Sequence, residues 1–319
     1  MTASSVKRFL KEYEVGEAFV GFFVIRNRDL RTRRNGEPYL TIEIGDRSGR
    51  LKGNIWEDAE MLYEQLTTDS VVKIRGMIET YQGSKQVAIQ QIRRARDKDE
   101  FDPADFLPVT SIDVEAGLEK LRRIAASLSS DHLRELLELF LSDDEFIAGF
   151  KQAPGGKLWH HNRLGGLLEH TLGVLRLCRM MSRFYPEANG DLLVAGAILH
   201  DIGKIEEFKY QLSFDYTDRG RLVGHIVLGA EWVTERSKLI DGFPADLLDQ
   251  LIHLVLSHQG EFGSPVQPST REAFMLHYAD LIDSKMDALK RIEGDLPEGE
   301  RWKYVNLLGR GIMFPDKGE

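Results

Sequence analysis

Along the first hundred residues, apolar and polar positions alternate in short runs that are rich in β-branched and aromatic residues. This alternation is typical of strands with one buried face. Turn-forming sequences such as NGEP, DRSG and QGS separate the runs. Five strands are predicted, at residues 18–30, 38–46, 49–56, 70–81 and 85–94. Strands this short and this evenly spaced predict a small closed barrel.

The spacing of apolar residues changes further along the chain. The segment RRARDKDEFDPADFLPVT combines a run of charges with two prolines and has no sustained periodicity, as expected of a linker. From about residue 113 apolar residues recur at intervals of three and four, which predicts helices. The segment YQLSFDYTDRGRLVG predicts a short β or loop excursion among them. We therefore expect a barrel domain at 1–96, a linker at 97–112 and a helical domain at 113–319, with its core at about 150–290.

Composition agrees with two domains. The chain has 319 residues, of which 42% are hydrophobic, enough for two cores of ordinary size. Apolar runs fall short of the roughly 20 residues that span a bilayer, and the N-terminal sequence MTASSVKRFLKEYE lacks a signal-peptide core. A cytoplasmic protein with no membrane partner is expected. Cys178 is the single cysteine, which excludes an internal disulfide and a cysteine-cluster zinc site. A metal would have to be held by His, Asp and Glu.

Charge is distributed unevenly along the chain. Residues 1–96 contain 17 Lys and Arg against 13 Asp and Glu, and the remainder contains 25 against 38, a net charge of −13. The basic excess includes two groups: Arg26, Arg28, Arg31, Arg33 and Arg34, then Arg47, Arg50 and Lys52. Such clusters attract phosphate backbones, although a solvated hairpin tip has the same composition. The acidic remainder argues against a protein that coats nucleic acid over its whole surface.

The sequence YLTIEIGDRSGRLKGNIW resembles the second and third strands of OB-folds, which bind oligonucleotides. OB-folds place aromatic and cationic side chains on that face to stack bases and follow phosphates. The resemblance makes Lys52 and Trp56 candidate nucleic-acid contacts. The alternative is that Phe22, Tyr39 and Trp56 fill the barrel core, and alternation favours this for at least one of them.

Candidate chemistry lies in the helical part. His200 and Asp201 are adjacent at the end of the apolar helix in DLLVAGAILHDIGKIEEF, which Gly203 is expected to close. A buried imidazole beside a buried carboxylate is costly unless a cation or another partner neutralises the pair.

Three further helices and one preceding helix each carry one metal-capable side chain. His170 shares an inward face with Leu167 and Val174, although a lone inward histidine is more often a satisfied core residue. His225 opens one helix, His258 ends the next, and Asp280 lies inside a third.

From about 150 to 290 the chain resembles the HD-domain metal-dependent phosphohydrolases, whose pattern is H…HD…H…H…D on a helical bundle. The most specific resemblance is to the YhaM-type 3′→5′ exoribonucleases, which place an OB-fold before the HD domain. It is carried by KLWHHNRLGGLLEHTLGV, ILHDIGKIEEF, GHIVLGAEWV, LVLSHQGEFGSPVQPSTREA and LHYADLIDSKMD.

The resemblance implies a ligand set for two divalent ions. One ion would be bound by His170, His200, Asp201 and Asp280, and Asp201 would bridge to a second held by His225 and His258. Mn²⁺ is the first expectation, with Mg²⁺, Fe²⁺ and Co²⁺ as alternatives.

The resemblance also implies roles at the reaction centre. Asp201 would orient the attacking water as well as bind metal. Lys204 would contact a phosphate as a point charge, the alternative being a solvated lysine at a helix end. His161 is a candidate substrate contact.

Other polar residues nearby are expected to stay outside the ligand set. His253 lies about 140° around the helix from His258, and His277 is predicted to be a structural neighbour. Asp283 and Asp287 are predicted at the surface or in support of the ligands. The family often has SHHG where this chain has Ser257-His258-Gln259-Gly260, which weakens the case for a third metal.

These features predict a metal-dependent enzyme that hydrolyses single-stranded RNA, and also single-stranded DNA, from the 3′ end to nucleoside 5′-monophosphates. One alternative is a phosphohydrolase of small or cyclic nucleotides with a regulatory OB domain. The other is a nucleic-acid-binding protein with an inactive HD domain. A homo-oligomer is left open.

Overall fold

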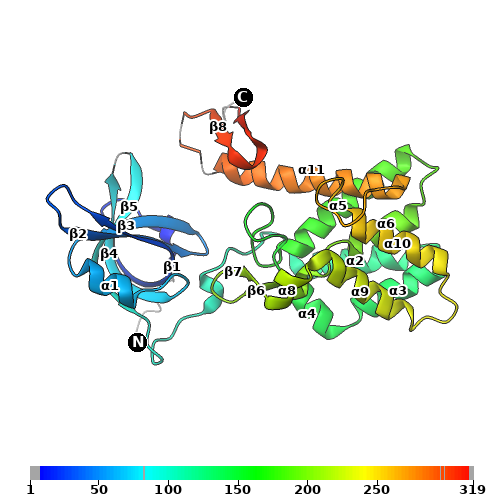
Figure 1. Cartoon of the computed structure of the whole chain (residues 1–319), viewed down its shortest axis with the longest axis horizontal. Coiled ribbons are helices and arrows are strands. Elements are labelled where there is room, and N and C mark those ends of the chain that lie inside the picture. The colour runs from blue at the N-terminus through cyan, green and yellow to red at the C-terminus, as the bar shows by residue number, and fades with distance from the viewer. Residues whose placement is uncertain (1–7, 82, 295, 298, 316–319) are drawn as a thin grey trace. The chain divides into compact units, whose positions relative to one another are not determined.

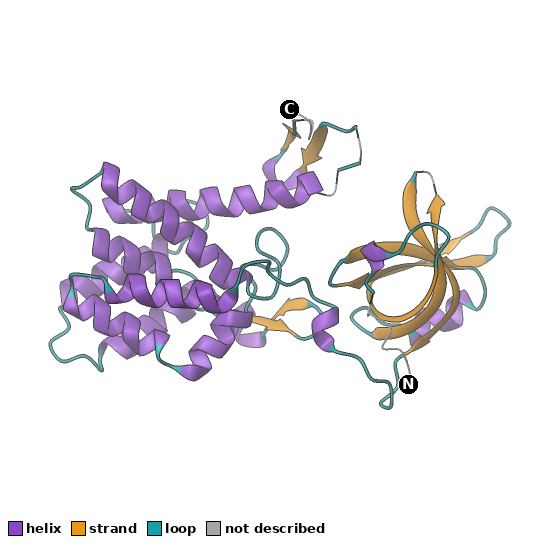
Figure 2. Ribbon diagram, turned by 180° about the vertical axis from the view of Figure 1, so that it is seen from behind, coloured by secondary structure: helices purple, strands orange, loops and turns teal. Residues whose placement is uncertain are grey.

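The computed structural model describes residues 8–81, 83–294, 296–297 and 299–315, and the chain divides into two compact units. The barrel unit contains the described residues up to Val109 together with Lys209–Asp215. The helical unit contains Thr110–Phe208 and the described residues from Tyr216 onward. Figures 1 and 2 show long strands in the first unit and helices in the second. The boundaries expected at residues 96 and 112 stay predictions.

The barrel is closed in the order β1-β2-β3-β5-β4, and all its pairs are antiparallel except β3 with β5. This confirms the predicted barrel. The strands are β1 (Ala18–Thr32), β2 (Pro38–Asp46), β3 (Gly49–Ile55), β4 (Val71–Tyr81) and β5 (Ser84–Arg94). A helix that the sequence analysis did not predict, α1 (Ala59–Gln65), joins β3 to β4, and short 3₁₀ turns occur at η1 (Leu10–Glu12) and η2 (Pro103–Asp105).

Side chains from alternate positions along the strands fill the barrel interior. On β2, Leu40, Ile42 and Ile44 are fully buried, whereas the residues between them face outward. Closure depends on Gly53, which pairs with Val87 across the parallel β3–β5 contact. A Cβ at Gly53 would lie 2.8 Å from the Val87 carbonyl oxygen, so any larger residue would push the two strands apart.

The predicted basic cluster on β1 does not form one free surface. Arg26 is buried and donates to the Leu212 and Phe106 carbonyls, and burial lowers its pKa to about 10. Arg28 lies over the Tyr63 ring, and Arg31 pairs with Asp29 at 2.6 Å. Several of these cations therefore hold the barrel together, which sequence spacing alone does not reveal.

The helical unit confirms the predicted α-helical bundle. Side chains accept backbone N–H groups at several helix N-termini, among them Asp113, Ser130, Asp143 and Asn189. The helices are α2 (Val114–Ala126), α3 (Asp131–Leu141), α4 (Asp144–Gln152), α5 (Gly166–Phe184), α6 (Gly190–Leu199), α7 (Lys204–Glu207), α8 (Asp218–Leu222), α9 (His225–Ser237), α10 (Ala245–Ser257) and α11 (Arg271–Gly294).

Short strands complete the chain. The predicted excursion is a two-stranded sheet, β6 (Phe208–Tyr210) with β7 (Phe214–Tyr216), followed by α8. After α11 come β8 (Trp302–Val305), η3 (Asn306–Leu308) and β9 (Arg310–Met313). Among the described residues, no helix has the length and apolarity required to cross a membrane.

Helix α6 is the centre of the helical unit. Every residue from Leu192 to Leu199 is buried, so the helix is apolar on all sides, and it packs against α5, α10 and α11. Its C-terminal end therefore lies in the interior, between these helices. His200 caps that end, which places the His200-Asp201 pair in the interior.

Candidate metal centre

Six predicted ligands meet at the end of α6. They come from different elements: His170 from α5, His200 and Asp201 from the end of α6, His225 from the start of α9, His258 from the end of α10 and Asp280 from α11. His200 and His258 are fully buried, as is His170, while the Asp280 side chain is 16% exposed. The structure thus brings together all six residues, and their binding of metal stays a prediction.

Asp201 lies between two groups of imidazoles. Its Oδ2 atom is 3.3 Å from Nε2 of His170 and 3.3 Å from Nε2 of His200. Its Oδ1 atom is 3.5 Å from Nε2 of His225 and 3.4 Å from Nε2 of His258. Asp280 joins the first group through Oδ1, 3.1 Å from Nε2 of His170. Each carboxylate oxygen of Asp201 therefore faces one candidate ion position.

Two atoms of this cluster lack a hydrogen-bond partner in the described structure. Asp201 Oδ1 and His258 Nε2 are both buried and unsatisfied. A buried acceptor left in this state costs about 1–3 kcal/mol, and more when it is charged. A cation between them satisfies both. Mixed imidazole and carboxylate donors suit a divalent ion such as Mn²⁺ or Fe²⁺, so the residues present fit the predicted group.

The four candidate histidines share one orientation. In each ring Nδ1 faces an acceptor: the Ala197 carbonyl for His200 at 3.0 Å, the Val255 carbonyl for His258 at 2.7 Å, Glu207 for His225 at 2.8 Å and Asp283 for His170 at 2.7 Å. A proton on Nδ1 leaves the Nε2 lone pair available for a metal. All four Nε2 atoms point toward the cluster centre.

The pKa shifts reflect concentrated negative charge. Burial opposes ionisation of His170, but hydrogen bonds to Asp201, Asp280 and Asp283 outweigh it and raise the pKa of His170 well above its ordinary value. Burial likewise opposes ionisation of Asp201, yet Lys204 and His200 hold the pKa of that carboxyl well below its usual range. The site is thus arranged to keep its carboxylates charged.

Lys204 is a buried member of the cluster. Its Nζ atom donates to Asp201 Oδ2 at 2.6 Å and to the Gly155 carbonyl at 2.5 Å. The alternative of a solvated lysine at a helix end is wrong. The predicted role of Gly203 as a helix C-cap is also wrong, because its φ of −61° is right-handed and it caps the N-terminus of α7.

The adjacent His160 and His161 have different surroundings. His161 is buried with Nε2 2.8 Å from Asp283 Oδ2, so it supports the carboxylate that holds His170. His160 has both ring nitrogens buried without a partner, its ring centroid lies 5.2 Å from that of His170, and burial lowers its pKa to about 2. His160 is therefore a neutral imidazole beside the cluster. A substrate contact by His161 stays a prediction.

Two neighbours behave as the sequence predicts. His253 Nε2 accepts the Ser269 N–H at 2.9 Å, and His277 Nδ1 faces the His258 carbonyl at 2.9 Å, so neither joins the ligand groups.

Sequence reasoning missed two supporting contacts: Glu207 holds His225, and the amide of Gln259 lies 3.0 Å from His225 Nε2. Asp283, expected at the surface or in support of the ligands, links His170 to His161. Glu207 contacts His225 across 18 residues of sequence, and a contact over that separation leaves no periodic signal.

The barrel unit carries the predicted aromatic face. The rings of Tyr39 and Trp56 stack at 5.0 Å on the outer side of β2 and β3, and the Arg33 guanidinium lies 4.6 Å from the Trp56 ring. Trp56 is 53% exposed and Lys52 is exposed on the same side of β3. The alternative that Trp56 fills the core is wrong.

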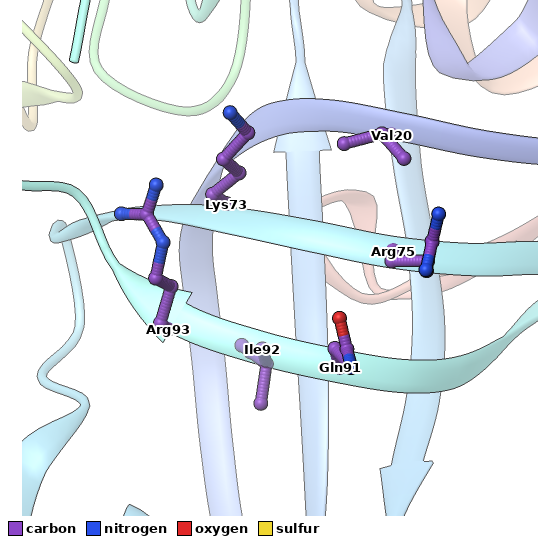
Figure 3. Close-up of a pocket in the computed structure, with 6 residues that line it drawn as sticks. All are labelled: Val20, Lys73, Arg75, Gln91, Ile92 and Arg93. Carbon is purple, nitrogen blue, oxygen red and sulfur yellow. The ribbon is translucent and has the colours of Figure 1, made fainter.

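A second basic area lies on another part of the barrel surface. A hollow of about 530 Å³ is lined by cations of β4 and β5, and Figure 3 shows Lys73, Arg75 and Arg93 beside it. Arg93 is held by two hydrogen bonds to Asp99, so its charge is partly neutralised.

Comparison with known proteins agrees with this architecture. Residues 167–285 match the HD domain, and residues 24–95 match the OB-fold nucleic acid binding domain. An HD domain indicates a metal-dependent phosphohydrolase, and its combination with a nucleic acid binding domain supports hydrolysis of nucleic acid.

Two solved structures resemble part of the chain. One is a replication protein A heterotrimer bound to ssDNA, at 18% identity over 28% of this chain and 64% of that chain, with a TM-score of 0.22. The chain thus spans slightly under two thirds of that protein's length. The other is the second OB-fold domain of replication protein A from Methanococcus maripaludis, at 11% identity over 28% of this chain and 96% of that chain, with a TM-score of 0.23.

Proposed function

We propose that the protein is a metal-dependent 3′→5′ exoribonuclease that degrades single-stranded RNA, and also single-stranded DNA, to nucleoside 5′-monophosphates. The observation that carries the chemistry is the Asp201 carboxylate, whose two oxygens face two separate groups of imidazoles. Such a bridge suits a pair of divalent ions acting on one phosphodiester. The direction of attack rests on the resemblance to the YhaM-type enzymes.

The cofactor would supply a water of lowered pKa and positive charge against the phosphate and leaving oxygens. His170, His200, Asp201 and Asp280 would hold one ion, and Asp201, His225 and His258 the other. The protein keeps these donors ready, since Nδ1 contacts fix each imidazole and Lys204 keeps Asp201 ionised. Lys204 also holds the Gly155 carbonyl, which fixes the loop before α5 beside the centre.

The barrel face would bind the strand. Stacking on Tyr39 and Trp56 is tolerant of sequence because every base has a π-face, and the exposed Lys52 would meet phosphates. An enzyme that removes successive nucleotides needs this tolerance. Support for a polymeric substrate thus comes from a surface outside the hydrolytic centre.

The test is a time course on end-labelled RNA and DNA with Mn²⁺, Mg²⁺ or chelator. With the label at the 5′ end, we expect a ladder of shortening strands and release of unlabelled 5′-monophosphates, with no reaction in chelator. Asp201→Ala should remove activity and bound metal, whereas Asp241→Ala, an exposed aspartate, should change neither. Release of the 5′ label as a mononucleotide before the strands shorten, or turnover of free nucleotides without any polymer degradation, would contradict the proposal.

A further inference from the structure

A cluster of unpaired cations lies on the helical unit between α2 and α5. Two hollows of about 270 and 350 Å³ share Lys120, Ile124 and Arg179, so together they form one elongated groove. We call this the α2–α5 groove. Its cations are Lys120, Arg123, Arg176, Arg179 and Arg183.

All five cations are exposed, and within the described residues none of their side chains has an ion pair or hydrogen bond. The described residues that line the groove include no acidic side chain. This concentration occurs in a part of the chain with a large acidic excess, since residues after 96 carry a net charge of −13. Solubility therefore does not explain five uncompensated positive charges at one place.

The floor of the groove is apolar. Ile124, Leu172 and Leu175 line it, and Met180 is 50% exposed at its side. The groove begins where α2 and α5 pack closely together: a Cβ at Gly117 of α2 would lie only 3.0 Å from the Leu172 side chain of α5. The charged side chains follow about one to two turns further along α2 and one to three turns further along α5, at the edges of the groove. An apolar floor between two cationic rims suits a ligand that alternates flat bases with phosphates.

Helix α5 also carries one of the candidate metal ligands. His170 lies on this helix, and Arg176 to Arg183 follow it by about 9 to 20 Å along the axis at 1.5 Å per residue. At about 100° per residue these cations project roughly 180–240° away from His170, so the groove is a separate surface from the candidate metal centre.

We propose that the α2–α5 groove binds the phosphate backbone of single-stranded RNA, as a second strand-binding surface on the HD domain itself. The choice of RNA rests on the proposed function, but the binding does not depend on catalysis. Loss of three phosphate contacts should lower the slope of log K against log salt by about 2.

The test uses the full chain in chelator, so that strands are bound but not cut. Arg176→Ala, Arg179→Ala and Arg183→Ala combined should weaken binding of a labelled oligoadenylate at least about tenfold and reduce the salt slope by about 2. The matched control combines Lys238→Ala, Lys290→Ala and Lys303→Ala, which removes three exposed charges elsewhere. Arg→Lys changes at the same three positions should restore most of the affinity.

Each outcome separates this inference from the proposed function. Equal RNA affinity and salt slope in the triple variant and its control would overturn the groove, whether or not the enzyme cuts RNA. The inference would also be overturned if the triple variant kept its RNA affinity but lost self-association, which would assign the groove to a second copy of the chain. Loss of binding to polyglutamate with intact RNA affinity would likewise assign it to an acidic protein. Arginine-dependent RNA binding by a protein that cleaves no RNA would leave the groove standing and refute the exonuclease.

Discussion

At the scale of single residues, the candidate metal centre depends on the atoms that hold its predicted ligands in place. The four imidazoles present Nε2 because an acceptor holds each Nδ1, and two of these acceptors are carboxylates, Glu207 and Asp283. Carboxylates in this position fix the ring and increase its basicity. Ligand geometry is therefore set by residues that no metal-binding motif contains.

Glu207→Ala tests this dependence. The change removes the acceptor of His225 Nδ1, so we expect affinity for the ion nearest His225 and His258 to fall about 10–100-fold. Competition with a calibrated chelator measures it. Glu206→Ala is the matched control, since Glu206 pairs with Arg219 at the surface. Unchanged metal affinity in Glu207→Ala would show that His225 is held by other contacts.

Gly203 has a steric role at the same scale. A Cβ there would lie 2.1 Å from the His225 carbonyl oxygen, where α7 begins beside the start of α9. Gly203→Ala should cost about 1–3 kcal/mol in the free energy of unfolding, because backbone must move. Urea denaturation measures it, with Gly190→Ala as control because its nearest neighbour is at 3.9 Å. Equal stability of both variants would contradict this steric role.

At the scale of elements, the sequence predicts well what depends on local periodicity. Alternation correctly located the five barrel strands, and Leu192 to Leu199 read as the apolar helix α6. The family motif marks the six predicted ligands, and the structure brings them together. Contacts between distant segments were not found: Arg26 appeared to be a surface cation, yet its partners Phe106 and Leu212 are 80 and 186 residues away.

One inter-element contact predicts a pH effect. Asp143 caps α4 and pairs with Arg236 of α9, and the Phe146 N–H, with smaller help from Arg236, lowers the pKa of Asp143 below its ordinary value of 3.8. A lowered folded-state pKa means that the carboxylate stabilises the fold above about pH 4 and that this stabilisation is lost as pH falls below it.

Asp143→Ala should therefore lower the free energy of unfolding by about 1 kcal/mol at pH 7. The difference from the wild type should shrink as pH falls through the acid range below 3.8. Chemical denaturation across pH measures it, and Asp144→Ala, exposed and next in sequence, is the control. A difference that grows toward acid would contradict the sign.

At the scale of the whole molecule, the proposed function places hydrolysis in the helical unit and base stacking in the barrel unit. Trp56→Ala should raise KM for long RNA about tenfold through lost stacking, while hydrolysis of a small diester such as bis-p-nitrophenyl phosphate stays unchanged. Steady-state kinetics on both substrates measures the split. Trp302→Ala removes another exposed indole, from β8, and should change neither. A parallel loss on both substrates in Trp56→Ala would mean general damage to the protein.

The barrel unit is discontinuous along the chain, and this has a consequence for how the protein is made. Leu212 packs on the buried cluster of Val24, Val71 and Phe106, and its carbonyl accepts from Arg26 at 2.6 Å. A ribosome that has finished Val109 must still synthesise the 106 residues 110–215 before this part of the barrel is complete. At about 5–20 residues per second this takes on the order of 5–20 s. During that interval the Arg26 guanidinium lacks the Leu212 carbonyl, and the barrel unit, although the first to emerge, is completed only after residues 110–208 of the helical unit have been synthesised.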